Sequence, residues 1–194
     1  AQIATALGVR SRILPMSDQP VRTTVRTPEG WLAFQEYFVK LRTEPDVLEI
    51  AYTGAEHARP APGVLEAIEA AHAVVLCPSN PLVSIGTTLA VPGIRAALLA
   101  TEAPIVAISP IVGGGTIKGP ADRMMRGLGL EVSPLGIAHA YRDFLDALVL
   151  DSQDAPVAGE VEKLGIRTHV TDTIMRSIQI KEQLARETLA AVLG

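Results

Sequence analysis

The sequence contains little cysteine and no long apolar run, and each of these shortages excludes a class of protein. Its single cysteine, Cys77, excludes an intrachain disulfide, so a reducing cytoplasm is the expected location. No apolar run approaches the roughly 20 residues that a helix needs to cross a bilayer, so no membrane partner is expected.

The patterns that indicate nucleic-acid binding, a metal centre or a nucleophile are also missing. The net charge is −4 with both signs interspersed, so no basic stripe marks a nucleic-acid surface. The four histidines show no spacing typical of metal ligands, and no Ser/His/Asp arrangement is recognisable. No Gly-Lys-Ser or Gly-Lys-Thr sequence completes a Walker loop.

The composition that is present indicates a globular α/β protein. Hydrophobic residues make up 48% of the chain but aromatic ones only 4%, and the mean hydropathy is +0.29. Strand-like and helix-like segments alternate from residue 47 onward. The predicted strands are 47–53, 73–77, 105–109, 147–150 and 167–170, and the predicted helices are 62–71, 92–100, 120–128, 137–144, 157–164 and 177–193. This alternation predicts a three-layer α/β fold with a mainly parallel, Rossmann-like open sheet and helices on both faces.

A smaller β-rich segment precedes the regular alternation. Short strands are predicted at 12–14 and 21–27, and residues 31–34 are expected to pair back across a turn. Aromatic residues at 34, 37 and 38 and Leu41 then follow the spacing of one helix face. This aromatic face either packs into the core or forms a platform for a flat ring.

The chain begins with a segment, residues 1–8, that resembles the last turns of a helix ending at Gly8. It has no initiator methionine. Residues 1–194 are therefore predicted to form a single α/β domain that is the carboxyl-terminal portion of a longer enzyme.

A glycine-rich loop at residues 110–122 is the first candidate binding element. Gly113–Gly115 permit a sharp turn and a close approach of the backbone to a ligand. Lys118 adds a positive charge next to a predicted helix start, with Pro120 at the first helical position. The combination favours a phosphate ligand, although the loop could also be a flexible connection with incidental glycines.

A second candidate loop, at residues 77–86, follows the preceding strand. Pro78 and Pro81 stiffen the backbone around Ser79 and Asn80, which could hold a base, a ribose or a phosphate. The alternative is a pair of turn residues that satisfy their own backbone. Both loops follow strands of the predicted parallel sheet, so the ligand site is expected beyond the carboxyl ends of those strands.

Four aspartates near predicted strand or helix ends have no single assignment. Asp122 lies in the first turn of a predicted helix, where it could stabilise the helix dipole or contact a metal or substrate. Asp151, Asp154 and Asp172 follow late strands, and any of them could contact Mg²⁺. The sequence does not choose among them, and no catalytic residue is assigned.

At the two loops the chain resembles the 2-phospho-L-lactate transferase family, which includes the phosphoenolpyruvate transferases. The first matching block is Cys-Pro-Ser-Asn-Pro at 77–81 with Ser-Ile-Gly at 84–86, continuing through 90–95. The second is Ser-Pro-Ile-Val-Gly-Gly at 109–114 with Lys-Gly-Pro-Ala-Asp at 118–122, and an aromatic segment at 34–38 precedes both. The resemblance extends from about residue 13 to the last helix. It implies only the carboxyl-terminal part of such an enzyme, because the glycine-rich first unit and a metal-associated aspartate of the family have no counterpart here.

The resemblance implies a step in the biosynthesis of coenzyme F420. The expected reaction passes a phospho-2-hydroxyacid group, phospholactate or phosphoenolpyruvate, from a guanosine diphosphate ester to the deazaflavin alcohol Fo, with release of GMP. Mg²⁺ is the implied cofactor, and a homodimer the implied assembly. The residues expected to bind the nucleotide are Ser79, Asn80, Ser84 and Gly86, and those expected to hold its phosphates are Ser109, Gly113, Gly114, Lys118 and Gly119. The alternative is a non-catalytic, nucleotide-sugar-binding regulator of the same fold.

Overall fold

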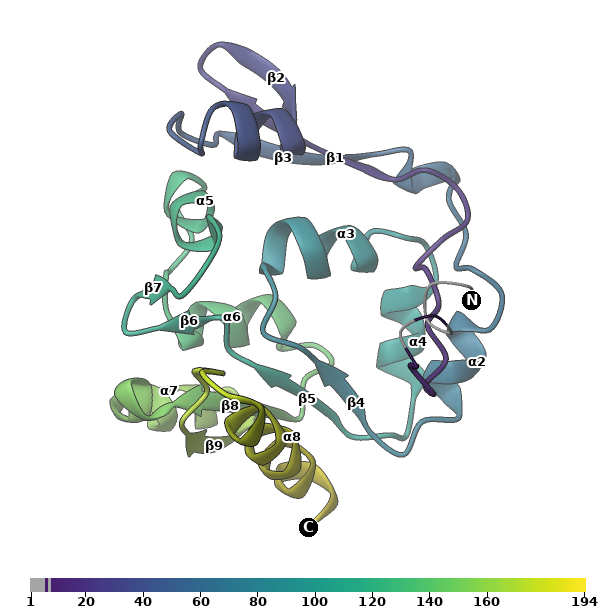
Figure 1. Ribbon diagram of the computed structural model, residues 1–194, viewed down its shortest axis with the longest axis vertical. Coiled ribbons are helices and arrows are strands. Elements are labelled where there is room, and N and C mark those ends of the chain that lie inside the picture. The colour runs from purple at the N-terminus through teal and green to yellow at the C-terminus, as the bar shows by residue number, and fades with distance from the viewer. Residues whose placement is uncertain (1–5, 7) are drawn as a thin grey trace.

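The computed structural model describes residue 6 and residues 8–194, within which the strands form three sheets (Figure 1). The largest is a parallel sheet in the order β4-β5-β8-β9. An antiparallel sheet has the order β2-β1-β3, and β6 pairs with β7 in a small hairpin. The helix predicted to end at Gly8 falls mainly outside the described residues.

The parallel sheet has helices on both faces, which confirms the predicted fold class. Its strands are β4 (Val74–Leu76), β5 (Ile105–Ile108), β8 (Ala147–Asp151) and β9 (Arg167–Thr171). The α-helices within the described residues are α2 (Val64–Glu69), α3 (Gly86–Leu89), α4 (Ile94–Ala100), α5 (Ala121–Gly127), α6 (Pro134–Tyr141), α7 (Ala158–Glu162) and α8 (Ile178–Leu193).

The two central strands, β5 and β8, are buried on both sides because their alternate residues enter two different cores. Ile105 and Leu148 belong to a large core with residues of α4, α6 and α7. Val106 and Val149 belong to a smaller core that Leu184 of α8 completes on the opposite face. These continuous apolar runs are the reason that both strands could be predicted closely.

The antiparallel sheet corrects one part of the sequence prediction. Its strands are β1 (Arg22–Thr27), β2 (Gly30–Ala33) and β3 (Glu49–Thr53). Strand 47–53 was expected to open the parallel alternation, but β3 pairs antiparallel with β1 in a separate sheet. The predicted strand at 12–14 is wrong, since these residues form no strand and Ile13 is exposed.

The antiparallel sheet lies over α3 and α5, which separate it from the parallel sheet (Figure 1). Helix α5 packs against both the antiparallel sheet and the large core of the parallel sheet, because its two adjacent methionines face opposite directions. Met124 is buried with Val25 and Tyr37 beneath the antiparallel sheet, whereas Met125 belongs to the large core. Tyr37 lies on a wide helical turn, η1 (Glu36–Lys40), so the predicted aromatic helix packs partly into the core.

One predicted loop is partly helical, and one predicted helix starts earlier than expected. The loop after β4 contains a helical turn, η3 (Pro81–Ile85), that runs directly into α3. Helix α6 begins before the predicted residue 137, because the Ser133 hydroxyl caps it by accepting a bond from the Gly136 N–H at 3.1 Å.

None of the helices in the described residues is by itself long and apolar enough to cross a membrane. One pair of segments, Pro81–Leu89 and Ile94–Ala100, passes that test jointly by length and composition, with a bend of 82° between them.

Candidate functional site

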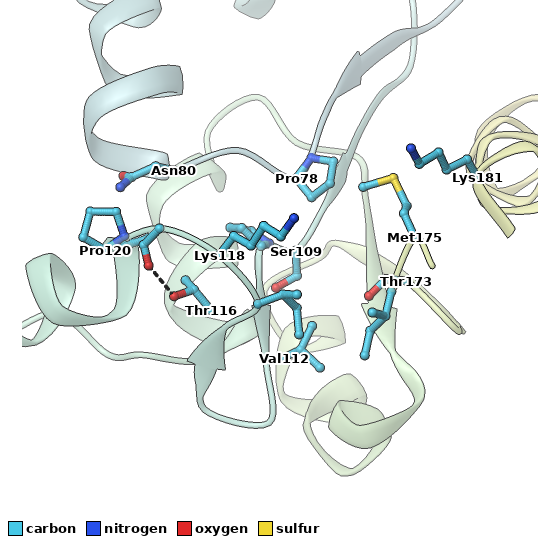
Figure 2. A pocket seen from close by; sticks show the side chains of 15 residues that line it. Pro78, Asn80, Ser109, Val112, Thr116, Lys118, Pro120, Thr173, Met175 and Lys181 are labelled. Carbon is cyan, nitrogen blue, oxygen red and sulfur yellow. Dashed lines mark hydrogen bonds between the residues drawn. The ribbon is translucent and has the colours of Figure 1, made fainter. Parts of the chain in front are cut away.

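A cavity of about 360 Å³ lies beyond the carboxyl ends of β4 and β5, where both candidate loops meet (Figure 2). Its lining residues are Pro78, Asn80, Ser109, Pro110, Val112, Thr116, Ile117, Lys118, Gly119, Pro120, Ala121, Thr173, Ile174, Met175 and Lys181. This position agrees with the rule that ligands of open parallel sheets bind outside the carboxyl ends of the strands. The volume is within the range of small-molecule pockets.

The glycine-rich loop forms the β6–β7 hairpin rather than an open loop. Strands β6 (Ile111–Val112) and β7 (Gly115–Thr116) are joined by Gly113 and Gly114, whose φ angles of 57° and 78° require glycine-like freedom. The hairpin therefore has a defined geometry, and its second strand leads into Lys118 at the cavity.

The segment that carries Lys118 is held by hydrogen bonds of the Thr116 side chain. The Thr116 hydroxyl lies 2.8 Å from the Gly119 carbonyl oxygen and 2.9 Å from Asp122 Oδ1, and it is shared between these two acceptors. Asp122 thus fastens the hairpin to the start of α5. Pro120 immediately precedes that helix instead of occupying its first position.

Two buried carboxylates at the end of β8 hold two walls of the cavity. Asp154 accepts the Gly113 N–H at 3.1 Å on both carboxylate oxygens, which ties down the hairpin. Asp151 accepts the N–H and the hydroxyl of Thr173 at 2.9 and 3.1 Å, and it also accepts two bonds from Gln153.

The two carboxylates differ in how their surroundings shift the pKa. Burial raises the pKa of Asp154; the Gly113 N–H opposes this shift, and the nearby charge of Asp151 adds to it. Burial also acts to raise the pKa of Asp151, but the bonds from Gln153 and Thr173 outweigh burial and lower it below its usual value. Asp151 is therefore a charged residue that holds the segment after β9 in place, and both of its carboxylate oxygens already accept hydrogen bonds.

The first loop places Asn80 at the cavity by fixing its side chain. Asn80 Oδ1 accepts the N–H groups of Leu82 and Val83 at 2.8 and 3.2 Å, so it caps the turn η3. Because the oxygen is engaged, the amide Nδ2 is the group left to contact a ligand. Its contact in the protein is the Met124 sulfur at 3.8 Å.

The structure brings four of the nine predicted site residues to the cavity wall. These are Asn80, Ser109, Lys118 and Gly119, whereas Ser79, Ser84, Gly86, Gly113 and Gly114 lie outside the lining. The two loops are thus neighbours, as the sequence predicted. The binding role of each of these nine residues stays a prediction.

Ser109 and Gly86 each have a structural task that the sequence did not reveal. The buried Ser109 hydroxyl donates to the Ile111 carbonyl at 2.9 Å and accepts the Ile111 N–H at 3.2 Å. A Cβ on Gly86 would lie 2.2 Å from the Tyr52 hydroxyl, which donates to the Leu82 carbonyl at 2.6 Å. Gly86 therefore makes room for a side chain of the antiparallel sheet.

The wall that sequence reasoning missed is the segment after β9. Thr173, Ile174 and Met175 line the cavity together with Lys181 of α8. The predicted strand at 167–170 ends at the same edge as the other parallel strands, so the strand-end rule could have indicated this segment.

The cavity lining is positively charged, with two lysines and no acidic residue. The described residues contain no group of three or more His, Cys, Asp or Glu side chains that could hold a metal ion. Asp151 and Asp154 accept hydrogen bonds from the segment after β9 and from the hairpin, respectively, and the binding of Mg²⁺ stays a prediction.

The chain is similar in sequence to enzymes named for the transfer of a phospho-acid. It is 41% identical over 184 residues to the 2-phospho-L-lactate transferase of Methanosarcina barkeri, covering 95% of this chain and 59% of that protein. It is 43% identical over 188 residues to the 2-phospho-L-lactate transferase of Methanothermobacter thermautotrophicus, covering 97% and 60%. It is 42% identical over 199 residues to the phosphoenolpyruvate transferase of Kitasatospora aureofaciens, covering 98% and 62%. The chain thus spans about three fifths of the length of these relatives.

The fold is shared with a more distant protein of known structure. The crystal structure of protein BH3568 from Bacillus halodurans superposes with a TM-score of 0.67 at 17% identity, covering 97% of this chain and 65% of that one. At this identity the similarity establishes the architecture alone. The family model described as 2-phospho-L-lactate transferase CofD matches residues 1–186, nearly the whole chain. The protein belongs to the 2-phospho-L-lactate transferase CofD family.

Proposed function

We propose that the protein acts in coenzyme F420 biosynthesis by transferring a phospho-2-hydroxyacid group from a guanosine diphosphate ester to the deazaflavin alcohol Fo. In this reaction the Fo hydroxyl attacks the phosphorus that carries the acid. The bond to the GMP oxygen breaks, the hydroxyl proton is lost, and a phosphodiester forms. Family membership supports the reaction class, and the cavity supports the kind of donor.

The observation that carries the proposal is the position of Lys118. Its side chain lines a cavity formed by two strand-end loops, and it forms no ion pair within the described part of the chain. A lysine without a carboxylate partner offers its full charge to a phosphate. In Figure 2 its amino group is turned into the space between Asn80, Pro78 and Met175.

The chain's own residues would contribute binding and positioning. Lys118 would offset the charge of the diphosphate, and the amide Nδ2 of Asn80 would donate to the nucleotide side. The hairpin, held by Asp154, would keep the backbone around Lys118 and Gly119 in one geometry, so that binding costs little ordering. Phosphoryl transfer depends mainly on positioning and charge stabilisation, which fits a site without a nucleophile.

Mg²⁺ remains part of the proposal without an assigned ligand. When bound, the ion would help to neutralise the charge of the diphosphate. The acid likewise stays open between phospholactate and phosphoenolpyruvate, since the identities to the two kinds of relative, 43% and 42%, are nearly equal. A homodimer is also part of the proposal, and light scattering would test it.

A melting experiment separates this function from a nucleotide-sugar-binding regulator of the same fold. GDP and Fo are each expected to raise the melting temperature, and UDP-glucose is not. A preference for UDP-glucose with no response to Fo would contradict the proposal and favour the regulator. Mass spectrometry of the product formed from Fo and each donor ester would then identify the acid.

A matched pair of variants connects the melting shift to the cavity. Lys118→Met is expected to abolish most of the GDP-induced shift. Lys163→Met, which removes an exposed lysine paired with Glu160, is expected to leave it unchanged. An equal shift in both variants would show that GDP binds elsewhere.

A further inference from the structure

A second lysine reaches the cavity from the last helix. Lys181 lies near the start of α8, and Leu184, one turn later, anchors that helix against Val106 and Val149 of the sheet. The anchored helix presents Lys181 at the carboxyl edge of the sheet. In Figure 2 its side chain extends from α8 toward Met175 and the space that Lys118 also faces.

Lys118 and Lys181 differ from the other two lysines of the chain in their partners. Lys40 is paired with Glu36 at 2.8 Å, and Lys163 is paired with Glu160 at 2.6 Å. Lys118 and Lys181 form no ion pair with any described residue. The sequence around Lys181 explains this, because no acidic residue stands three or four positions before or after it on α8. Among the residues that the structure describes, the two lysines without a carboxylate partner are thus the two that line the cavity.

The surface between the two lysines is mainly apolar. Val112 and Ile117 come from the hairpin side, and Ile174 and Met175 come from the segment after β9. This segment is held in place by the two bonds from Thr173 to Asp151. Arg176, which follows Met175, is paired with Asp172, so it does not supply a competing unpaired cation.

Two cations separated by an apolar wall suit a ligand with two anionic ends joined by a short carbon chain. The proposed donor has two such ends, because the ester oxygen and C2 of the acid join its phosphoryl group to its carboxylate. We infer that Lys181 binds the carboxylate of the three-carbon acid, while Lys118 binds the diphosphate. The inference rests on the proposed function and makes Lys181 a specificity-determining residue for 2-hydroxyacid esters.

Three ligands separate carboxylate recognition from a general effect of charge. They are GDP, the guanosine diphosphate ester of lactate, and the guanosine diphosphate ester of ethanol, which keeps the methyl group of lactate and has hydrogen in place of the carboxylate. Calorimetric titration of the unaltered chain is expected to show about tenfold tighter binding of the lactate ester than of the ethanol ester.

Two variants at the same position then test the assignment. Lys181→Met is expected to bind the lactate and ethanol esters about equally well, with little change in its affinity for GDP. Lys181→Arg, which keeps the positive charge, is expected to retain most of the preference for the lactate ester. Because the Lys181 side chain is exposed, neither variant is expected to change the melting temperature.

Two results would overturn the inference, and only the second would also overturn the proposed function. If Lys181→Met weakened all three ligands equally, Lys181 would act on the diphosphate or through general charge, and the proposed function would still stand. If the unaltered chain bound none of the three ligands, the inference and the proposed function would both fail.

Discussion

Replacing Asp151 with asparagine should destabilise the protein strongly, because this buried side chain accepts four hydrogen bonds. The donors are the N–H and side-chain amide of Gln153 at 3.0 and 3.2 Å, and the N–H and hydroxyl of Thr173 at 2.9 and 3.1 Å. Asparagine keeps one oxygen and turns the other acceptor into a donor, so two of the four bonds are lost. At about 1.5–3 kcal/mol for each bond to a charged group, the free energy of unfolding should fall by at least about 3 kcal/mol.

The same variant should show a characteristic pH dependence. The pKa of Asp151 is lowered from its ordinary value of 3.8, because the hydrogen bonds outweigh the effect of burial. A carboxylate with a lowered pKa in the folded state contributes stability above the unfolded-state pKa and loses it as the pH falls through the folded-state value. The gap between Asp151→Asn and the unaltered chain should therefore be largest at neutral pH and shrink below about pH 3.8.

Urea unfolding followed by circular dichroism at neutral and acidic pH measures both effects. Asp18→Asn is a matched control, since Asp18 is exposed and its side chain makes no hydrogen bond with the described residues. The control should change the free energy of unfolding by less than about 0.5 kcal/mol. Two results would refute the role given to Asp151. One is a change in the free energy of unfolding of less than about 0.5 kcal/mol in Asp151→Asn at neutral pH; the other is a difference between this variant and the unaltered chain that stays constant on acidification.

Three further substitutions test other parts of the structure. Lys118→Met should weaken GDP binding by about 1.5–3 kcal/mol in a calorimetric titration, and an unchanged Kd would contradict its phosphate role. Gly86→Ala should lower the free energy of unfolding by about 1–3 kcal/mol, because the new methyl group displaces the Tyr52 hydroxyl. Gly115→Ala is the control and should have little effect, because a Cβ at that position has no neighbouring atom within 4 Å. Met124→Ala should cost about 2–5 kcal/mol in urea unfolding because Met124 is fully buried, and a loss below about 1 kcal/mol would show that it does not join the two parts of the fold.

The elements that could be predicted from the sequence are those with a strong local pattern. Strands β5 and β8 are continuous apolar runs, and α8 has a long amphipathic repeat with a Ser177 cap. The pairing partner of β3 was missed because pairing depends on residues far away in the chain. None of the residues of β3 is fully buried: Glu49 and Thr53 are exposed and the three residues between them are partly buried, unlike the buried parallel strands β5 and β8.

The candidate site could be predicted in position but only partly in composition. The strand-end rule placed the two loops correctly beside one another, since β4 and β5 are adjacent parallel strands. Lys181 was missed because it lies far from both loops in sequence, and only the lack of an acidic residue three or four positions away on α8 distinguishes it from an ordinary surface lysine. The structural roles of Gly86 and Ser109 depend on contacts with Tyr52 and Ile111 that no sequence pattern marks.

A crystal structure of the protein with GDP would test the central claim, that the cavity between the two loops holds the diphosphate. The expected result is a phosphate oxygen within about 3.2 Å of Lys118 Nζ, with the nucleotide side near the Asn80 amide. A GDP molecule bound away from this cavity, or bound in it with both phosphates directed away from Lys118, would contradict the account.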